Sequence, residues 1–191
     1  MNHDDVLATL LGRYSTGPRH LAEPAPDDAA LQRMAAAALR APDHAQLVPF
    51  RFVLIRGAAR ERLADLFEQT AIAAGKPPDA AALDRERALR PPLTVAVVAR
   101  IDHGHPLVPA HEQWIAVGGA IANFLNAAHA LGFGGKMLSG AKVRAPAAVA
   151  AFCGPGETLV GWIAMGTPVR APSGREKAAP GEVMRDWPPE A

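Results

Sequence analysis

Residues 40–52 read RAPDHAQLVPFRF, and this stretch marks a change from helix to strand. The apolar-periodic helix before it should end near Pro42, since the residue preceding a proline disfavours the α region. The apolar run Phe52–Ile55 that follows is typical of a strand buried on both faces. Between the two, Arg40 and His44 lie on a loop that rigid elements hold at both ends. Functional residues are often found on such loops.

Helices and strands are expected to alternate along the rest of the chain. Apolar periodicity, caps and breakers predict helices at residues 3–11, 28–41, 58–75, 111–131 and 146–152, and an exposed, charged helix at 79–90. Apolar and β-branched runs predict further strands at residues 93–99, 134–140 and 158–165. This order, without tight hairpin signals, favours an α/β or α+β domain of about four or five strands. Beyond Gly166 the chain is rich in proline and charge, which predicts an extended tail.

The composition argues against several classes of function. A net charge of +1 provides no basic excess for binding nucleic acid. A single cysteine, Cys153, excludes an intramolecular disulfide and a cysteine-based zinc site, and it fits a reducing compartment. The acidic residues near Met1 are unlike the basic start of a secretory signal. We therefore expect a cytoplasmic protein that binds neither nucleic acid nor a membrane.

One uncharged stretch, residues 114–135, is close in length to the about 20 residues that span a bilayer. It contains Asn123, Asn126 and His129 together with several glycines, so we interpret it as a helix buried in protein. A helix that is apolar on most sides needs covering on most sides. In a chain of 191 residues, a second subunit is the expected cover.

No standard catalytic motif is present, since the chain has no nucleophile elbow, no Walker loop and no GxGxxG after a strand. Arg13-Tyr14-Ser15 could bind a phosphate through guanidinium and hydroxyl groups, but a solvated turn explains it about as well. Arg40 could equally cap its own helix, and His44 could be a hydrogen-bonded turn residue. His103, His105 and His111 match no standard zinc spacing, so we expect no metal site.

Taken in order, several segments resemble the flavin-dependent nitroreductase family, in particular its smallest single-domain members. Arg13-Tyr14-Ser15 is similar to the family's Arg-Arg-Ser signature. Residues 39–52 resemble its Arg-Ala-Pro-Asp-His and Pro-Trp-x-Phe run. The glycine-rich turn at 132–135, followed by Ser139, and the Gly-Thr-Pro at 166–168 also match its pattern. The resemblance covers roughly residues 7–168.

The resemblance implies an α+β fold with a mostly antiparallel sheet, flanked by helices, and a long buried helix at a homodimer interface. It implies an FMN-binding domain at residues 1–168, followed by a proline-rich tail at 169–191. It also implies a ping-pong enzyme in which NAD(P)H reduces FMN, and the flavin then reduces a nitroaromatic or a quinone. Because the flavin carries this chemistry, no catalytic side chain is required.

The resemblance also assigns binding residues by position. It places these residues at the FMN: Arg13, Tyr14, Ser15, Arg40, His44, Met137, Leu138 and Ser139. It places these residues at the nicotinamide nucleotide: Ala127, Ala128, His129, Ala130, Leu131 and Gly132.

The chain departs from the family pattern at several positions. Tyr14 stands in place of the second arginine, and Val48 and Phe50 replace a glutamine and a tryptophan. Met137-Leu138 replaces a Trp-Arg pair, which removes a cation worth roughly 1.5–3 kcal/mol per charged contact. The alternative is therefore a non-catalytic relative that binds a flavin or another small ligand. An interaction domain without a ligand is a third interpretation.

Overall fold

The computed structural model describes residues 3–170 and 177–187. Its strands are β1 (Leu21–Ala22), β2 (Phe50–Ile55), β3 (Leu93–Arg100), β4 (Gly134–Leu138) and β5 (Glu157–Pro168). Its helices are α1 (His3–Leu11), α2 (Asp28–Ala38), α3 (Ala59–Ala73), α4 (Pro78–Leu89), α5 (Ala110–Ala130) and α6 (Pro146–Phe152). Short 3-10 turns lie at Pro18–His20, His44–Gln46, Ala141–Arg144 and Pro180–Glu182.

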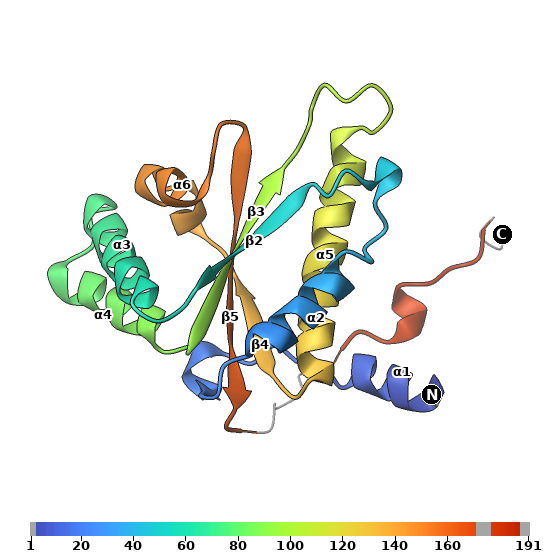
Figure 1. Ribbon diagram of the computed structural model, residues 1–191, viewed down its shortest axis with the longest axis horizontal. Helices are drawn as coiled ribbons and strands as arrows, with labels where there is room; N and C mark the ends of the chain where they lie inside the picture. The colour runs from blue at the N-terminus through green and yellow to red at the C-terminus, as the bar shows by residue number, and fades with distance from the viewer. Residues whose placement is uncertain (1–2, 171–176, 188–191) are drawn as a thin grey trace.

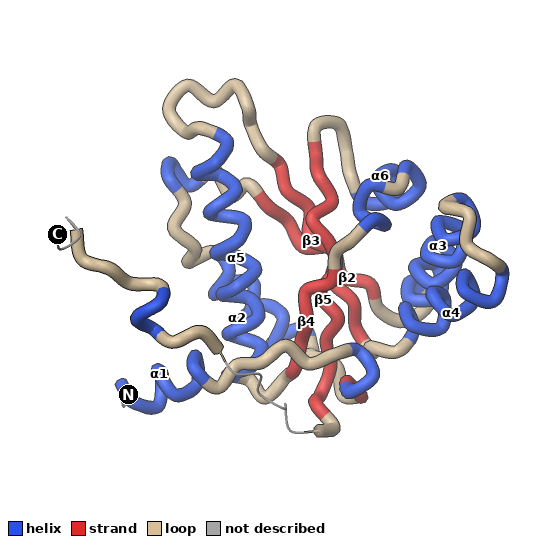
Figure 2. Tube along the Cα trace, turned by 180° about the vertical axis from the view of Figure 1, so that it is seen from behind, coloured by secondary structure: helices blue, strands red, loops and turns tan. Residues whose placement is uncertain are grey.

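The longest strand, β5, organises the sheet. It pairs with β3 on one side and with β4 on the other, and its last residues pair with β1. β2 pairs with β3 at the edge of the sheet, and every one of these strand pairs is antiparallel. Helices lie on both faces, with α2 and α5 on one and α3, α4 and α6 on the other (Figures 1 and 2). The predicted α+β class is thereby confirmed.

Strand alternation divides the side chains between the two faces. Val95 and Ile163 are register partners, so they point to the same side, where they pack with Phe124 of α5 and Met34 of α2 in the larger hydrophobic core. These four side chains are at most 1 % exposed. The face covered by α2 and α5 is therefore fully packed.

The opposite face holds a smaller core. Ala96 and Trp162 are register partners there, and they pack with Leu63 of α3 and Ala148 of α6. The ring of Trp162 meets Phe67 of α3 edge-on, with ring centroids 4.8 Å apart. Leu63, Phe67 and Trp162 of this core also line the cleft described below.

Two expectations about burial were wrong. The β2 strand is an edge strand, and only its first and last residues, Phe50 and Ile55, are buried, whereas the residues between them are partly or fully exposed. The α4 helix is amphipathic rather than exposed, because Ala81, Asp84 and Ala88 are buried against α3. Small side chains on α4 gave no apolar stripe in the sequence, although they allow the two helices to approach closely.

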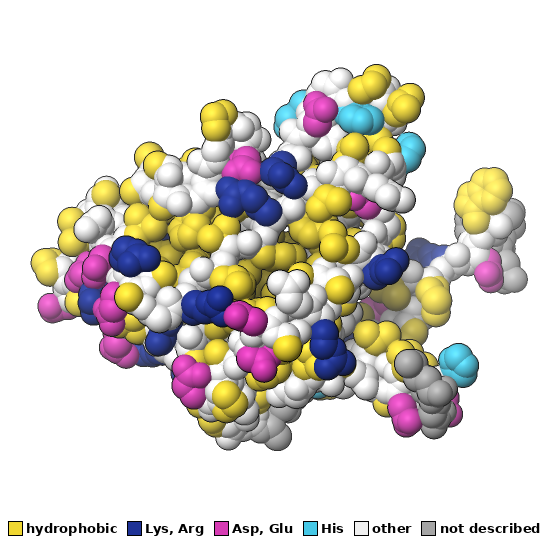
Figure 3. All heavy atoms as spheres, viewed as in Figure 1, with side chains coloured by type: hydrophobic (Ala, Val, Ile, Leu, Met, Phe, Trp, Pro, Cys, Tyr) yellow, Lys and Arg dark blue, Asp and Glu magenta, His cyan; other side chains and the backbone are white. Residues whose placement is uncertain are grey.

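Several large apolar side chains remain exposed in the single chain. The predicted stripe of α1 faces solvent, with Leu7 and Leu11 at 55 % and 72 % exposure. On α5, Ile115 is 62 % exposed. After Lys177, which borders the cleft described below, the C-terminal segment up to residue 187 extends away from the body and exposes hydrophobic side chains (Figure 3). Within the described ranges, no helix combines the length and apolar character needed to cross a membrane.

Candidate functional site

A cleft of about 1530 Å³ opens on the side of the sheet that carries α3, α4 and α6. Its wall combines the segment 13–20 with residues of α3, α4 and β4 and of the turn Ala141–Arg144. The floor is formed by one face of the sheet, through Thr94, Lys136, Leu138 and Trp162. These four point to the same side because Leu138 pairs with Trp162, while Lys136 and Thr94 both pair with Ala164.

The segment predicted to bind phosphate lies directly beside this floor. Ser15 forms a parallel bridge with Gly135 of β4, and the amide of Thr16 donates to the Gly135 carbonyl at 3.1 Å. Arg13, Tyr14 and Ser15 thus line the same cleft as Leu138 and Ser139. The structure therefore brings together two segments that lie more than a hundred residues apart in the sequence.

Met137, which the resemblance also assigns to the flavin, points to the other face of the sheet. It alternates with Lys136 and Leu138, pairs with Ile163, and packs against the larger core. Its side chain therefore does not line the cleft. Lys136 does, and the same alternation along β4 could have indicated it from the sequence.

The lining of the cleft is strongly cationic. It includes half of the 20 lysines and arginines of the chain. These cationic residues are Arg13, Arg19, Lys76, Arg87, Arg90, Lys136, Lys142, Arg144, Arg170 and Lys177. Among the described residues, the only carboxylate in the lining is Asp84. A net charge of +1 for the whole chain conceals this local excess, which favours an anionic ligand.

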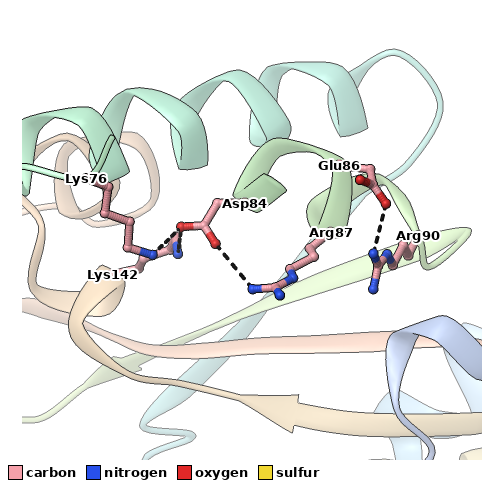
Figure 4. A network of polar contacts seen from close by, with 6 residues as sticks. All are labelled: Lys76, Asp84, Glu86, Arg87, Arg90 and Lys142. Carbon is pink, nitrogen blue, oxygen red and sulfur yellow. Dashed lines mark hydrogen bonds and ion pairs between the residues drawn. The ribbon is translucent and has the colours of Figure 1, made fainter. Parts of the chain in front are cut away.

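Asp84 is itself neutralised by its neighbours (Figure 4). Its Oδ2 accepts from Lys76 Nζ at 2.7 Å and from Lys142 Nζ at 2.9 Å, and Arg87 lies 3.9 Å from Oδ1. Burial acts to raise the pKa of Asp84, but the two lysine hydrogen bonds outweigh it, so the pKa is lowered. The carboxylate stays ionised and ties α4 to the turn that follows β4.

Part of the cleft wall is apolar. Leu63, Phe67 and Trp162 line it, and Lys142 lies 5.4 Å from the centroid of the Phe67 ring. Two buried polar atoms in this lining, Trp162 Nε1 and Thr70 Oγ1, have no hydrogen-bond partner within the described part of the chain. The cleft thus combines cationic side chains with an aromatic wall.

Arg40 and His44 do not line this cleft. Their loop packs on α5, and His44 Nδ1 lies 2.8 Å from Glu112 Oε2. The loop is strained, because Ala45, Gln46 and Val48 all have positive φ, between 48° and 61°. Asp43 holds it by accepting from the Val48 amide at 2.8 Å. A strained loop that surrounding structure stabilises is a common feature of binding sites.

Residues 127–132, assigned by the resemblance to a nicotinamide nucleotide, lie outside the cleft as well. Ala128 is 1 % exposed, and Ala127 and Leu131 pack against the larger core. Gly132 adopts a φ of +86° and ends α5. His129 lies near Gly12, at the end of α1. In the single chain, this segment is part of the packed face of the molecule.

A second polar cluster lies at the opposite end of the same face, between β2 and the loop after α6. Arg51 donates to both oxygens of Glu157 and to the Phe152 carbonyl. The hydrogen bond from Arg51 and that from the Gly154 amide lower the pKa of Glu157 to about 2. Burial raises the pKa of the nearby Cys153 thiol, which therefore stays protonated. The cluster joins structural elements and provides no reactive group.

The remaining candidates have local structural roles. His105 Nδ1 accepts from the amides of Leu107 and Val108, at 3.2 and 2.9 Å, and so organises the loop before α5. The described residues contain no group of histidine, cysteine and acidic side chains arranged to hold a metal ion.

The fold and the site together define a class of protein, an antiparallel α+β domain with a cationic cleft on one face of its sheet. The chain belongs to the nitroreductase family, since the family model described as "Nitroreductase family" matches residues 10–167. An Escherichia coli protein named "Putative NAD(P)H nitroreductase YdjA" is 41 % identical over 165 residues, which cover 86 % of this chain and 88 % of that protein.

Solved structures share the fold. A nitroreductase-like family protein from Bacillus cereus has a TM-score of 0.82 at 21 % identity, with 98 % of each chain covered. A structure from Desulfovibrio desulfuricans, described as a putative nitroreductase in complex with FMN, has a TM-score of 0.73 at 22 % identity, again with 98 % of each chain covered. At these identities, the likeness establishes the fold alone.

Proposed function

We propose that this protein is an FMN-dependent NAD(P)H oxidoreductase of nitroreductase type, and that it reduces nitroaromatics or quinones by two electrons in a ping-pong reaction. The observation that carries this proposal is the cleft, in which Arg13 and Ser15 meet Lys136 and Ser139 beside an aromatic wall. Two comparisons support it: the Escherichia coli relative is named "Putative NAD(P)H nitroreductase YdjA", and the Desulfovibrio structure is described as a complex with FMN.

The lining of the cleft fits FMN at both ends of that molecule. The Arg13 guanidinium and the Ser15 hydroxyl would donate to the phosphate, because charge-assisted donors of this kind bind phosphate well. Phe67 and Trp162 would exclude water from the ring system, and Leu138 would pack beneath it. Lys136 lies on the same face of β4 as Leu138. Its ammonium group would supply positive charge near the position where the family pattern has an arginine and this chain has Leu138. When bound, FMN would accept a hydride from NAD(P)H and pass electrons to the acceptor.

The proposed active form is a homodimer. The exposed apolar side chains of α1, of α5 and of segment 177–187 provide a large surface for a second subunit. In such a dimer, we propose that Arg40 and His44 of one subunit contact the FMN bound in the cleft of the other. Glu112 accepts the hydrogen bond from His44 Nδ1, so Nε2 is left free to face a ligand. Residues 127–132 remain a proposed nicotinamide contact on the strength of the resemblance alone.

Anaerobic reduction of the purified protein tests this function. We expect bound FMN to bleach on addition of NADPH or NADH and to regain its colour when a quinone is added. FMN that binds but is reduced by neither nucleotide would favour the non-catalytic alternative. Absence of any FMN-dependent rise in melting temperature would favour an interaction domain without a ligand.

The oligomeric state provides a separate test. Ile115→Glu places a charge on the exposed face of α5 without touching the core, so it should convert a dimer into a monomer in light-scattering measurements. Leu54→Glu, at an exposed apolar position on the edge strand β2, is the matched control and should leave the dimer intact. A monomeric wild-type protein would contradict the proposed dimer.

A further inference from the structure

The cleft holds more positive charge than one FMN phosphate requires. In the described part of the chain, Arg13, Lys136 and Arg144 line the cleft without any carboxylate partner. Arg87 has only a distant contact, at 3.9 Å from Asp84. A single phosphate monoester carries about two negative charges at neutral pH. The volume of about 1530 Å³ also exceeds the roughly 300–1,000 Å³ that a small ligand typically fills.

The surplus cations lie apart from the proposed FMN phosphate ligands. Arg13 and Ser15 adjoin Gly135 at the start of β4. Arg87 and Arg144 lie instead on α4 and on the turn after β4, two elements that Asp84 and Lys142 join directly. The arginines of this second group are both solvent-exposed, so they are open to a ligand entering the cleft. The lining therefore contains a second cationic group, separated from the first along β4.

Among its described residues, the cleft has no free carboxylate of the kind that would favour NADH, which carries a 2′-hydroxyl, over NADPH, which carries a 2′-phosphate. In Rossmann-type sites a carboxylate binds the ribose 2′-hydroxyl of NAD, whereas an arginine accommodates the 2′-phosphate of NADP, and the charge preference of these two groups holds for any cleft. Asp84 is the only carboxylate among the described lining residues, and Lys76 and Lys142 both occupy its Oδ2 atom. A 2′-hydroxyl would have to compete with two ammonium groups for it.

We infer that NADPH is the preferred reductant over NADH, and that Arg87 and Arg144 bind its 2′-phosphate. This inference rests on the proposed function. The planar guanidinium groups can each form two parallel hydrogen bonds to phosphate oxygens. Lys76 and Lys142 stay paired with Asp84 and add positive potential behind them. The preference thus arises from charge at the α4 side of the cleft and not from residues 127–132.

The test is anaerobic stopped-flow reduction of the FMN-loaded protein by each nucleotide. Wild type should be reduced at least about tenfold more efficiently by NADPH, as a charge-assisted contact is worth at least that factor. Arg87→Gln and Arg144→Gln should each lower the efficiency with NADPH about tenfold, through the dissociation constant, while the efficiency with NADH changes by less than about threefold. Arg33→Gln, an exposed arginine on α2 outside the cleft, is the matched control for both nucleotides.

An equilibrium measurement separates recognition of the phosphate from electron transfer. Adenosine 2′,5′-bisphosphate should compete with NADPH more strongly than ADP does, and the two arginine variants should abolish the difference. Equal efficiencies for the two nucleotides, or an equal loss for both in the variants, would overturn the inference and leave the proposed function standing. A bound flavin that neither nucleotide reduces would overturn both.

Discussion

The two faces of the sheet are stabilised in different ways. On the face covered by α2 and α5, side chains such as Val95, Ile163 and Phe124 fill the space almost completely. The other face has a smaller hydrophobic core, around Trp162 and Leu63, and ion pairs such as Asp84–Lys142 and Arg51–Glu157 lie beside it. The difference suggests a division of roles, in which close packing determines the fold while charge leaves room for a ligand.

The largest expected effect is on the packed face. Phe124→Ala should lower the free energy of unfolding by about 3–5 kcal/mol, because it removes a fully buried ring that stacks on Phe52. Phe67→Ala, on the face with the cleft, is the matched variant and should cause less than half that loss, since its ring is only partly buried. Chemical denaturation measures both, and equal losses would contradict the contrast between the faces.

A smaller effect is expected for ligand binding in the cleft. Arg13→Gln should weaken FMN binding about tenfold or more by removing a charge-assisted phosphate contact, while the melting temperature of the FMN-free protein stays unchanged. Flavin fluorescence titration gives the dissociation constants. Arg33→Gln on α2 is the control. A similar loss of FMN affinity in that variant would mean that the net charge of the protein, and not a contact from Arg13, determines FMN binding.

Arg51→Gln tests whether an ion pair stabilises the face with the cleft. It breaks the hydrogen bonds to Glu157 and to the Phe152 carbonyl, so we expect a loss of about 1.5 kcal/mol. The value is at the low end of the range because the guanidinium is partly open to solvent. Thermal unfolding measures the loss. No change in this variant would mean that packing, and not charge, joins α6 to the sheet.

The same pair predicts a dependence on pH. The pKa of Glu157 is depressed from 4.5 to about 2, so its contribution is fully present above about pH 5 and is lost as the pH falls from 4.5 towards 2. Wild type should therefore lose more stability than Arg51→Gln across this interval. Parallel pH profiles for the two proteins would contradict this prediction, because they would show that the ion pair does not cause the loss of stability between pH 4.5 and 2.

Most of the fold followed from local patterns in the sequence. The apolar run at residues 93–99 and the uncharged stretch around Phe124 indicated β3 and α5, because deeply buried elements leave strong patterns. Asp27 stands directly before the helix predicted from residue 28, and it caps α2 because its Oδ1 accepts from the Ala30 amide at 2.8 Å. The buried side of α4 escaped prediction, since alanines and one aspartate form no apolar stripe.

The site could be predicted only in part. The sequence indicated Arg13 and Ser139 through a family resemblance, and the structure brings both to one cleft. It did not indicate Lys142 or Arg144, because their place beside α4 depends on contacts between distant segments. Local periodicity carries no information about such contacts. The net charge of +1 gives no sign of the cationic cleft either, because acidic residues elsewhere in the chain balance its positive charge. Arg40 and His44, predicted at the same site, instead lie beside α5, where only a second subunit could unite them with the cleft.

Whether the cleft between the sheet and α4 holds FMN can be measured from the absorbance spectrum of the purified protein, after incubation with FMN and removal of the excess. We expect a yellow protein with the absorption bands of bound flavin and close to one FMN per chain, and much less flavin retained by Arg13→Gln. A colourless wild-type protein that fails to retain added FMN would contradict this expectation.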